Sequence, residues 1–247
     1  MRGKRILILG GTGEARELAA QLLEAGFDPV TSLAGVTASP RWPVGEIRTG
    51  GFGGVGGLCT YIESEGIASI VDATHPFAAQ ISRHGFEAAT RCGIPYLRLE
   101  RPAWRPEAGD HWTEVHNVAE AAAALPKGAR PLVTIGRKDI AAFFARGDLS
   151  GVARMIEEPT CAVPEGWIVL RERPPFTLER EFNLLMAHGV THLVSKNAGG
   201  EDTRAKLIAA REKNIPVIMI ERPVKPVARI AIAARDVITA LGDLLSA

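Results

Sequence analysis

Two long stretches of this chain repeat one another, and the repetition limits the folds open to it. Residues 66–102 read GIASIVDATHPFAAQISRHGFEAATRCGIPYLRLERP, and residues 189–223 read GVTHLVSKNAGGEDTRAKLIAAREKNIPVIMIERP. Each has a glycine, an apolar strand, a polar turn, a helical segment, Ile-Pro, a second apolar strand and Glu-Arg-Pro. Strands that alternate with helices in this way form parallel sheets covered by helices. The sequence therefore predicts an α/β protein.

The repeat extends beyond these stretches, since residues 111–125 resemble 227–241 and residues 130–144 weakly resemble the opening segment. We predict two similar Rossmann-like parallel-sheet halves, residues 1–126 and 127–247, with a ligand cleft between them. The alternative is one larger sheet whose strand–helix–strand units look alike because all such units do. In the first half the expected strands are Arg5–Leu9, Pro29–Leu33, Glu46–Thr49, Ser69–Asp72 and Tyr96–Leu99, and the expected helices are about Ala15–Ala25, Leu58–Glu65 and Ala78–Cys92.

Composition excludes several classes of protein. The 29 basic and 28 acidic residues leave a net charge of +1, which argues against a general nucleic-acid surface. Cys59, Cys92 and Cys161 lie too far apart for a metal motif and are typical of reduced thiols in a cytoplasmic protein. No signal-peptide pattern is visible, and no apolar run approaches the roughly 20 residues of a membrane span.

The first strand runs directly into a glycine-rich turn and a helix. The turn residues are Gly10, Gly11, Thr12, Gly13, Glu14 and Ala15. Backbone N–H groups at such a helix start bind phosphate, so the segment predicts nucleotide binding. The dinucleotide fingerprint is imperfect, because Arg16 stands where its third glycine or alanine is expected. A tight turn without a ligand is the alternative.

The end of the second strand indicates which nucleotide binds. An NAD site usually has Asp or Glu there, whereas this chain has Ser32, Leu33, Ala34 and Gly35. The nearest acid, Asp28, precedes the strand, and Arg16, Arg41 and Arg48 are close in sequence. A missing carboxylate with nearby cations favours the 2′-phosphate of NADP(H). Alternatively, Ser32 caps a turn and the arginines are solvated.

Two further turns of the first half follow strands. The loop after the third strand includes Gly51, Phe52 and Gly53, and Phe52 is suited to stack on a flat ring; a flexible surface loop is the alternative. After the fourth strand, Pro76 is expected to start a helix, which places Thr74 or His75 near its N-cap. We expect His75 and Pro76 to contact substrate, with His75 as the candidate catalytic residue, although a lone histidine is more often structural.

Turns of the second half are cationic and rich in glycine. They contain Arg137 after one strand and Lys196, Asn197, Gly199 and Gly200 after another, with Lys206 in the following helix. Cations and free backbone N–H groups bind carboxylates, so these residues predict a polyanionic substrate. For Lys206 an exposed helix charge is the favoured alternative. No metal cluster or nucleophile motif is visible, which fits hydride transfer with a cofactor.

An ordered set of motifs resembles the precorrin-6A reductase family (CobK/CbiJ-like) of cobalamin biosynthesis. The set is GGTGEAREL, SLAG, GGFGG, DATHPFAAQIS, LRLERPAW, the Gly-Arg turn, SKNAGG and IPVIMIERP, which runs to residue 223. The resemblance implies an NADPH-dependent reductase that adds hydride to one ring double bond of a tetrapyrrole and gives precorrin-6B. It implies NADPH on the first half and the macrocycle between the halves. Arg98, Arg101 and Lys206 are further candidate cations for its carboxylates, beside Arg137 and Lys196. One departure is Ala198, where the family is expected to have serine.

Other functions predict features that this sequence lacks. A short-chain reductase needs a Tyr-x-x-x-Lys pair, but Glu65 follows Tyr61 and Glu100 follows Tyr96 at that spacing. A redox-sensing NADP-binding module without turnover predicts one functional half, whereas polar turns occur in both. The sequence leaves open whether the substrate carries cobalt.

Overall fold

The computed structural model describes residues 3–35 and 42–246 and confirms the α/β class. Within these residues, two six-stranded sheets form, and every strand pairing in them is parallel. The chain divides into two compact units, Met1–Arg101 with Pro223–Ala247, and Pro102–Arg222.

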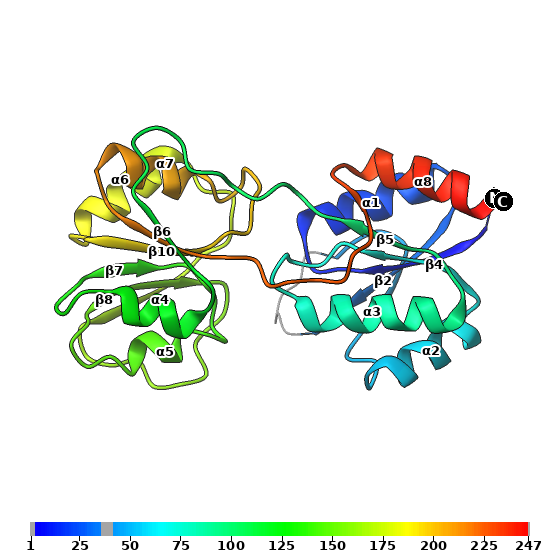
Figure 1. Cartoon of the computed structure of the whole chain (residues 1–247), viewed down its shortest axis with the longest axis horizontal. Helices are drawn as coiled ribbons and strands as arrows, with labels where there is room; N and C mark the ends of the chain where they lie inside the picture. Colours follow the sequence, from blue (N-terminus) through cyan, green and yellow to red (C-terminus); the bar gives the residue numbers. More distant parts are fainter. Residues whose placement is uncertain (1–2, 36–41, 247) are drawn as a thin grey trace. The chain divides into compact units, whose positions relative to one another are not determined.

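The first unit contains a sheet of order β12-β5-β4-β1-β2-β3 (Figure 1). Its strands are β1 (Arg5–Leu9), β2 (Asp28–Leu33), β3 (Glu46–Thr49), β4 (Ile67–Asp72), β5 (Tyr96–Leu99) and β12 (Arg229–Ala231). Its helices are α1 (Gly13–Glu24), α2 (Val55–Ser64), α3 (Ala79–Cys92) and α8 (Ala234–Ser246). The strands and helices expected in this half are confirmed, with ends shifted by up to three residues.

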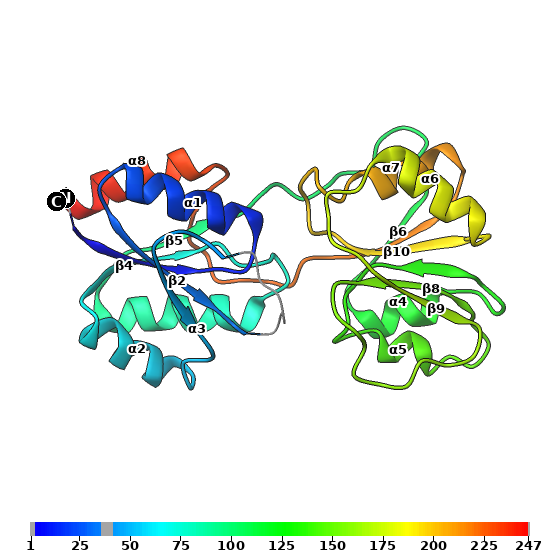
Figure 2. The same cartoon turned by 180° about the vertical axis from the view of Figure 1, so that it is seen from behind.

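The second unit repeats this arrangement with the order β6-β11-β10-β7-β8-β9 (Figure 2). Its strands are β6 (Trp112–Val115), β7 (Pro131–Val133), β8 (Gly151–Met155), β9 (Trp167–Arg171), β10 (His192–Lys196) and β11 (Val217–Ile220). Its helices are α4 (Val118–Ala124), α5 (Ala141–Phe144), α6 (Leu178–Ala187) and α7 (Ala205–Glu212). The duplication predicted from sequence is therefore visible in the strand orders.

The boundary expected at residues 126–127 does not match these units. β6 follows the five strands of the first sheet in the chain, yet it pairs with β11 of the second sheet. β12 follows the five strands of the second sheet, yet it pairs with β5 of the first. Each repeat thus gives its last strand and helix to the other sheet. Sequence similarity identifies the repeats but carries no information on which sheet a strand joins.

Alternation along β1 builds the core on both faces of the first sheet. Ile6 and Ile8 pack with residues of α1 and α8, whereas Leu7 and Leu9 pack with residues of α2 and α3. Figure 1 shows these two helix pairs on opposite faces of the sheet. A strand that is buried on both faces has a continuous apolar sequence, and this pattern predicts β1.

The second unit contains a buried ion pair between β8 and α6. Arg154 in β8 donates to Glu181 in α6 at 2.6 Å, and their side chains are 4% and 0% exposed. The guanidinium lies 3.9 Å from the centroid of the Phe176 ring. Because both charges are out of water, each depends on the other.

None of the described helices is long and apolar enough to cross a lipid bilayer.

We predict that Arg154→Leu destabilises the protein by about 3–5 kcal/mol, because it leaves the Glu181 carboxylate buried without its cation. The double variant Arg154→Leu/Glu181→Leu should recover most of this loss. Urea unfolding followed by circular dichroism measures both. Arg171→Gln is the control, because it breaks an exposed pair with Glu158 and should cost under about 1 kcal/mol. A single variant as stable as the control would contradict the prediction.

Candidate functional site

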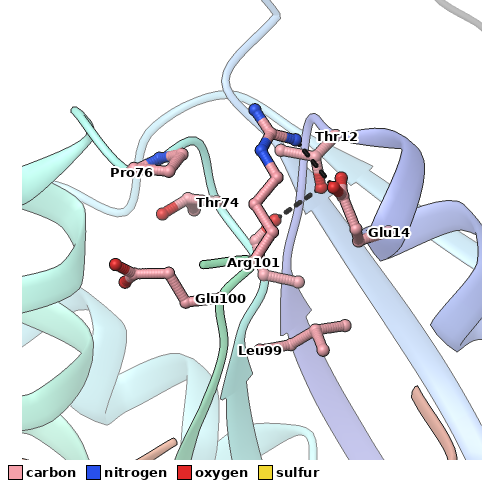
Figure 3. A pocket seen from close by; sticks show the side chains of 8 residues that line it. Thr12, Glu14, Thr74, Pro76, Leu99, Glu100 and Arg101 are labelled. Atoms are coloured by element: carbon pink, nitrogen blue, oxygen red, sulfur yellow. Dashed lines mark hydrogen bonds and ion pairs between the residues drawn. The ribbon is translucent and has the colours of Figure 1, made fainter. Parts of the chain in front are cut away.

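A pocket in the first unit lies where β1, β4 and β5 end (Figure 3). It is lined by Thr12, Glu14, Ala73, Thr74, Pro76, Leu99, Glu100 and Arg101. Thr12, Glu14 and Pro76 were predicted site residues, and the structure brings them together. Ligands of open α/β sheets bind at this end of the strands.

Thr12 joins the glycine turn to the neighbouring strand. Its hydroxyl accepts from the backbone N–H of Ala15 at 3.1 Å and donates to the carbonyl of Ala73 at 2.7 Å. It is thus the N-cap of α1. A Cβ on Gly10 would lie 2.7 Å from Cγ2 of Thr31 in β2. Glycine at position 10 therefore lets the turn pass close to β2. The result is a fixed turn at the positive end of a 12-residue helix, which suits phosphate.

An ion pair occupies the edge of this turn. Arg101 donates to the Glu14 carboxylate at 2.7 Å. Burial tends to raise the pKa of Glu14, but hydrogen bonds from Arg101 and the backbone outweigh it and hold the pKa below its usual value. An unpaired carboxylate would repel a phosphate at this turn, and Arg101 offsets the charge of Glu14. Arg101, which was expected as a substrate cation, is therefore engaged within the first unit.

Arg48 connects the ends of β2 and β3. It lies opposite Ser32 in the parallel register, and its Nη1 is 3.4 Å from the Ser32 Oγ. It also donates to the carbonyls of Gly50 and Gly51, each at 2.7 Å. Its guanidinium lies 3.7 Å from the centroid of the Phe52 ring. Phe52, which was expected to stack on a ligand ring, here stacks on Arg48.

The other predicted cofactor residues lie around these two turns. Gly11, with φ of +113°, precedes α1, and Leu33, Ala34 and Gly35 continue from Ser32. Arg16 folds back within α1, where its Nη1 donates to the carbonyl of Thr12 at 3.2 Å. Arg41 lies outside the described residues.

The turn after β4 differs from the predicted one. The N-cap of α3 is Ala78 and not Thr74 or His75, because residues 75–78 form a separate turn in which the Ala78 N–H donates to the His75 carbonyl. His75 is exposed, and its Nδ1 accepts from the backbone N–H of Phe77 at 3.2 Å. Pro76 is buried in the pocket wall.

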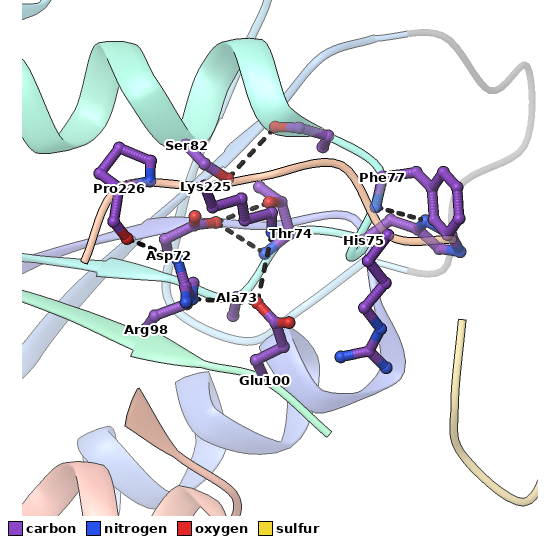
Figure 4. Close-up of polar contacts among 12 residues, drawn as sticks. Asp72, Ala73, Thr74, His75, Phe77, Ser82, Arg98, Glu100, Lys225 and Pro226 are labelled. Carbon is purple, nitrogen blue, oxygen red and sulfur yellow. Dashed lines mark hydrogen bonds and ion pairs between the residues drawn. The ribbon is translucent and has the colours of Figure 1, made fainter. Parts of the chain in front are cut away.

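A buried carboxylate that sequence reasoning missed fixes this turn (Figure 4). Oδ1 of Asp72 accepts from the N–H and the hydroxyl of Thr74, at 3.0 and 2.6 Å. Its Oδ2 accepts from the Tyr96 hydroxyl at 2.8 Å. Burial, together with the Asp72 carboxylate, raises the pKa of Tyr96 above its ordinary value. The position of Asp72 at a strand end was the available sequence signal.

Arg98 is buried in a structural cluster. It lies 2.9 Å from the Glu100 carboxylate and donates to the carbonyl of Pro226 at 3.0 Å. Lys225 approaches the same carboxylate at 3.5 Å, as Figure 4 shows. The expectation that Arg98 faces substrate is wrong, because its guanidinium holds the returning segment against β5.

In the second unit, the turn after β10 is tied to residue 104. The amide of Asn197 is buried, accepts from the N–H of Trp104 at 2.9 Å and donates to its carbonyl at 3.0 Å. The indole of Trp104 donates to the Gly200 carbonyl. A Cβ on Gly199 would lie 2.1 Å from the Pro102 carbonyl oxygen. Asn197, Gly199 and Gly200 therefore fix the conformation of the turn and its contact with residues 102–104.

Two lysines of this unit differ in their surroundings. Lys196 is 17% exposed and forms an ion pair with Asp139 at 2.6 Å. Lys206 is only 5% exposed, donates to the Thr134 hydroxyl at 3.1 Å and lies 5.4 Å from the Trp104 ring centroid. The favoured interpretation of Lys206 as an exposed helix charge is wrong. Arg137 is half-buried in the turn after β7.

Arg222 is a further residue that the sequence analysis missed. Its guanidinium donates to the carbonyls of Asn197 and Ala198 at 2.9 and 3.1 Å. It belongs to one of the repeated Glu-Arg-Pro endings, which supplied a signal for its importance. In residues 3–35 and 42–246, no three His, Cys, Asp or Glu side chains are grouped so as to hold a metal ion.

Comparisons with known proteins agree over nearly the whole chain. The family model described as Precorrin-6x reductase CbiJ/CobK matches residues 5–241. A precorrin-6A reductase of Rhodococcus erythropolis is 49% identical over 224 residues, 90% of each chain. One of Rhodobacter capsulatus is 41% identical over 244 residues, 98% of this chain and 94% of the relative. A solved structure of CobK precorrin-6A reductase superposes with a TM-score of 0.91 at 40% identity, covering 97% of this chain and 96% of the other.

We predict that Arg101→Gln raises the pKa of Glu14 toward its ordinary value near 4.5, because the variant removes the hydrogen bond and the charge that lower it. A lowered carboxylate pKa stabilises the fold only above the native pKa. At neutral pH the wild type should therefore have a larger unfolding free energy than the variant. The difference should shrink as the pH falls through the native Glu14 pKa. Carboxyl NMR titration and unfolding at several pH values measure both, and an unchanged Glu14 titration would contradict the prediction.

Proposed function

This chain belongs to the precorrin-6x reductase CbiJ/CobK family, and we propose that it reduces a macrocyclic double bond of precorrin-6A with NADPH, giving precorrin-6B in cobalamin biosynthesis. The observation that carries the proposal is the match over residues 5–241, which includes the nucleotide turn and both cationic turns. The substrate is a tetrapyrrole with many carboxylates.

The turn at α1 is suited to the phosphates of a nicotinamide cofactor, because Thr12 fixes it and the helix N-terminus is positive. When bound, NADPH supplies a hydride from C4 of the nicotinamide to an electrophilic ring carbon. A protonated ring nitrogen of the substrate can take up the charge, so no strong protein acid is required. His75, exposed after β4, is our candidate to orient substrate or to relay a proton.

Preference for NADP(H) is supported by what stands at the end of β2. Ser32 occupies the position where an NAD enzyme has a carboxylate, and Asp28 stands at the opposite end of the strand. We therefore expect NADPH to bind at least about tenfold more tightly than NADH. Equal dissociation constants for the two cofactors would contradict this part of the proposal.

Carboxylates of the substrate are assigned to the second unit. Lys196 is the last residue of β10, and Arg137 lies in the turn after β7. The two strands end side by side in the sheet because they pair in parallel. Lys196 retains partial exposure, as a cation that meets a ligand requires. Lys206 lies in α7, the helix that follows the Lys196 turn, and donates to Thr134, directly after β7. We assign it a supporting role beneath these turns.

The test is NADPH oxidation with purified precorrin-6A. We predict that Lys196→Gln lowers kcat/KM about tenfold or more, because a charge-assisted contact to a substrate carboxylate is lost. His75→Ala should also lower it. Lys127→Gln is the matched control, since Lys127 is an exposed cation of the same unit and its replacement should change kcat/KM less than twofold.

Each outcome of this test has a distinct meaning. Unchanged kcat/KM for both Lys196→Gln and His75→Ala would overturn the site assignment. NADPH binding without oxidation, with either precorrin-6A or its cobalt-containing form, would overturn the reductase proposal and favour a sensing module. Turnover of the cobalt-containing form alone would correct the substrate. Thermal unfolding of each variant separates loss of contact from loss of fold.

A further inference from the structure

We propose that Arg48 binds the 2′-phosphate of the cofactor and thereby makes the site selective for NADP(H) over NAD(H). The inference rests on the proposed use of NADP(H) and adds the residue that recognises it. Neither the glycine turn nor Ser32 carries a positive charge, so recognition of a phosphate on the ribose requires another side chain.

Arg48 stands where the ribose is expected. In a Rossmann-type sheet the side chain at the end of the second strand meets the ribose 2′-position. Here that side chain is Ser32, which lies opposite Arg48 in the register of β2 and β3. The Arg48 Nη1 is 3.4 Å from the Ser32 Oγ, so a group bound at this hydroxyl lies within reach of the guanidinium.

The guanidinium keeps hydrogen-bond donors available for a ligand. Of its five N–H donors, Nη1 directs two at the Gly50 carbonyl and the Ser32 hydroxyl, and Nη2 directs one at the Gly51 carbonyl. Within the described part of the chain, Nε has no hydrogen-bond partner. The donors that remain on the guanidinium can bind the oxygens of a phosphate.

The surroundings hold Arg48 in one orientation without neutralising it. The Phe52 ring lies 3.7 Å from the guanidinium carbon, and the Tyr61 ring lies 5.2 Å from it. Among the described residues, no carboxylate forms an ion pair with Arg48. In the same unit, Arg5 pairs with three carboxylates and Arg101 pairs with Glu14. A positioned cation without a counterion is suited to bind an anion.

The glycine loop after β3 holds Arg48 in place through two backbone carbonyls. Gly50 has a φ of +100°, a conformation that side chains disfavour, and its carbonyl and that of Gly51 accept from Arg48. The loop thus orients the arginine. The predicted cofactor residues Gly51 and Phe52 then act on the cofactor through Arg48.

Arg16 is the competing arginine in the described residues. It lies in the first turns of α1 and donates to the Thr12 carbonyl at 3.2 Å, at the turn suited to the pyrophosphate. NADPH and NADH share the pyrophosphate, so Arg16 should contribute equally to both cofactors. The two arginines are therefore distinguished by the ratio of affinities.

The experiment compares binding of 2′,5′-ADP and 5′-AMP to the full chain by isothermal titration calorimetry. For Arg48→Gln we expect 2′,5′-ADP to bind about tenfold to a hundredfold more weakly, with 5′-AMP changed less than threefold. Arg16→Gln should weaken both and leave their ratio unchanged. Arg83→Gln, at an exposed position of α3, is the control that should change neither.

Ser32→Asp is a second variant that leaves Arg48 and its loop in place. The new carboxylate should pair with Arg48 and repel the 2′-phosphate, so the preference for 2′,5′-ADP should again be lost. Thermal unfolding checks that each variant folds.

The outcomes separate this inference from the proposed function. If wild type binds 5′-AMP as tightly as 2′,5′-ADP, the proposed NADP(H) preference fails, and Arg48 has no 2′-phosphate to bind. If wild type prefers 2′,5′-ADP and Arg48→Gln keeps that preference, only the assignment of Arg48 is overturned. A ratio changed by Arg16→Gln alone would transfer the role to Arg16.

Discussion

The parallel pairing of β12 with β5 is the interaction on which the first unit depends. It returns the end of the chain to the first sheet and brings α8 onto the face that α1 covers. The same return places Lys225 and Pro226 against Glu100 and Arg98, directly after β5. Glu100 lines the pocket, so the returning segment supports the wall of the site. Folding of the first unit therefore requires the last 25 residues as well as the first hundred.

Sequence analysis predicted well what local patterns determine, and failed where distant contacts decide. The apolar run of β1, the glycine turn and the repeat were readable because each is written in consecutive residues. The exchange of β6 and β12 between the two sheets could not be predicted, because the sequence of a strand does not show which strand it pairs with. Asp72 was passed over because the Tyr96 hydroxyl, which donates to its carboxylate, comes 24 residues later and meets it only in the fold. Lys206 was misjudged because its burial depends on Trp104, about a hundred residues earlier.

The two units share a fold but differ where a nucleotide would bind. β7 and β8 take the places of β1 and β2 in the strand order, and Val133 aligns with Ile8 in the repeat. Ile8 lies opposite Thr31, and Val133 lies opposite Ala153. The next residue along, Ser32 in the first unit, therefore corresponds to Arg154 in the second. Arg154 is buried against Glu181, and the helix after β7 has four residues where α1 has 12. The second unit thus lacks both the long helix and the open strand end. We propose that its cations bind carboxylates of the substrate instead.

In the proposed function, the first unit binds the nucleotide and the second does not. Hydrogen–deuterium exchange of the full chain, with and without saturating NADPH, distinguishes the two units. We expect slower exchange on binding at residues 10–15, 32–35 and 48–54. The equivalent segments of the second unit, residues 135–140 and 154–157, should exchange at unchanged rates. Protection of the second set of segments without the first would show that the nucleotide binds to the second unit.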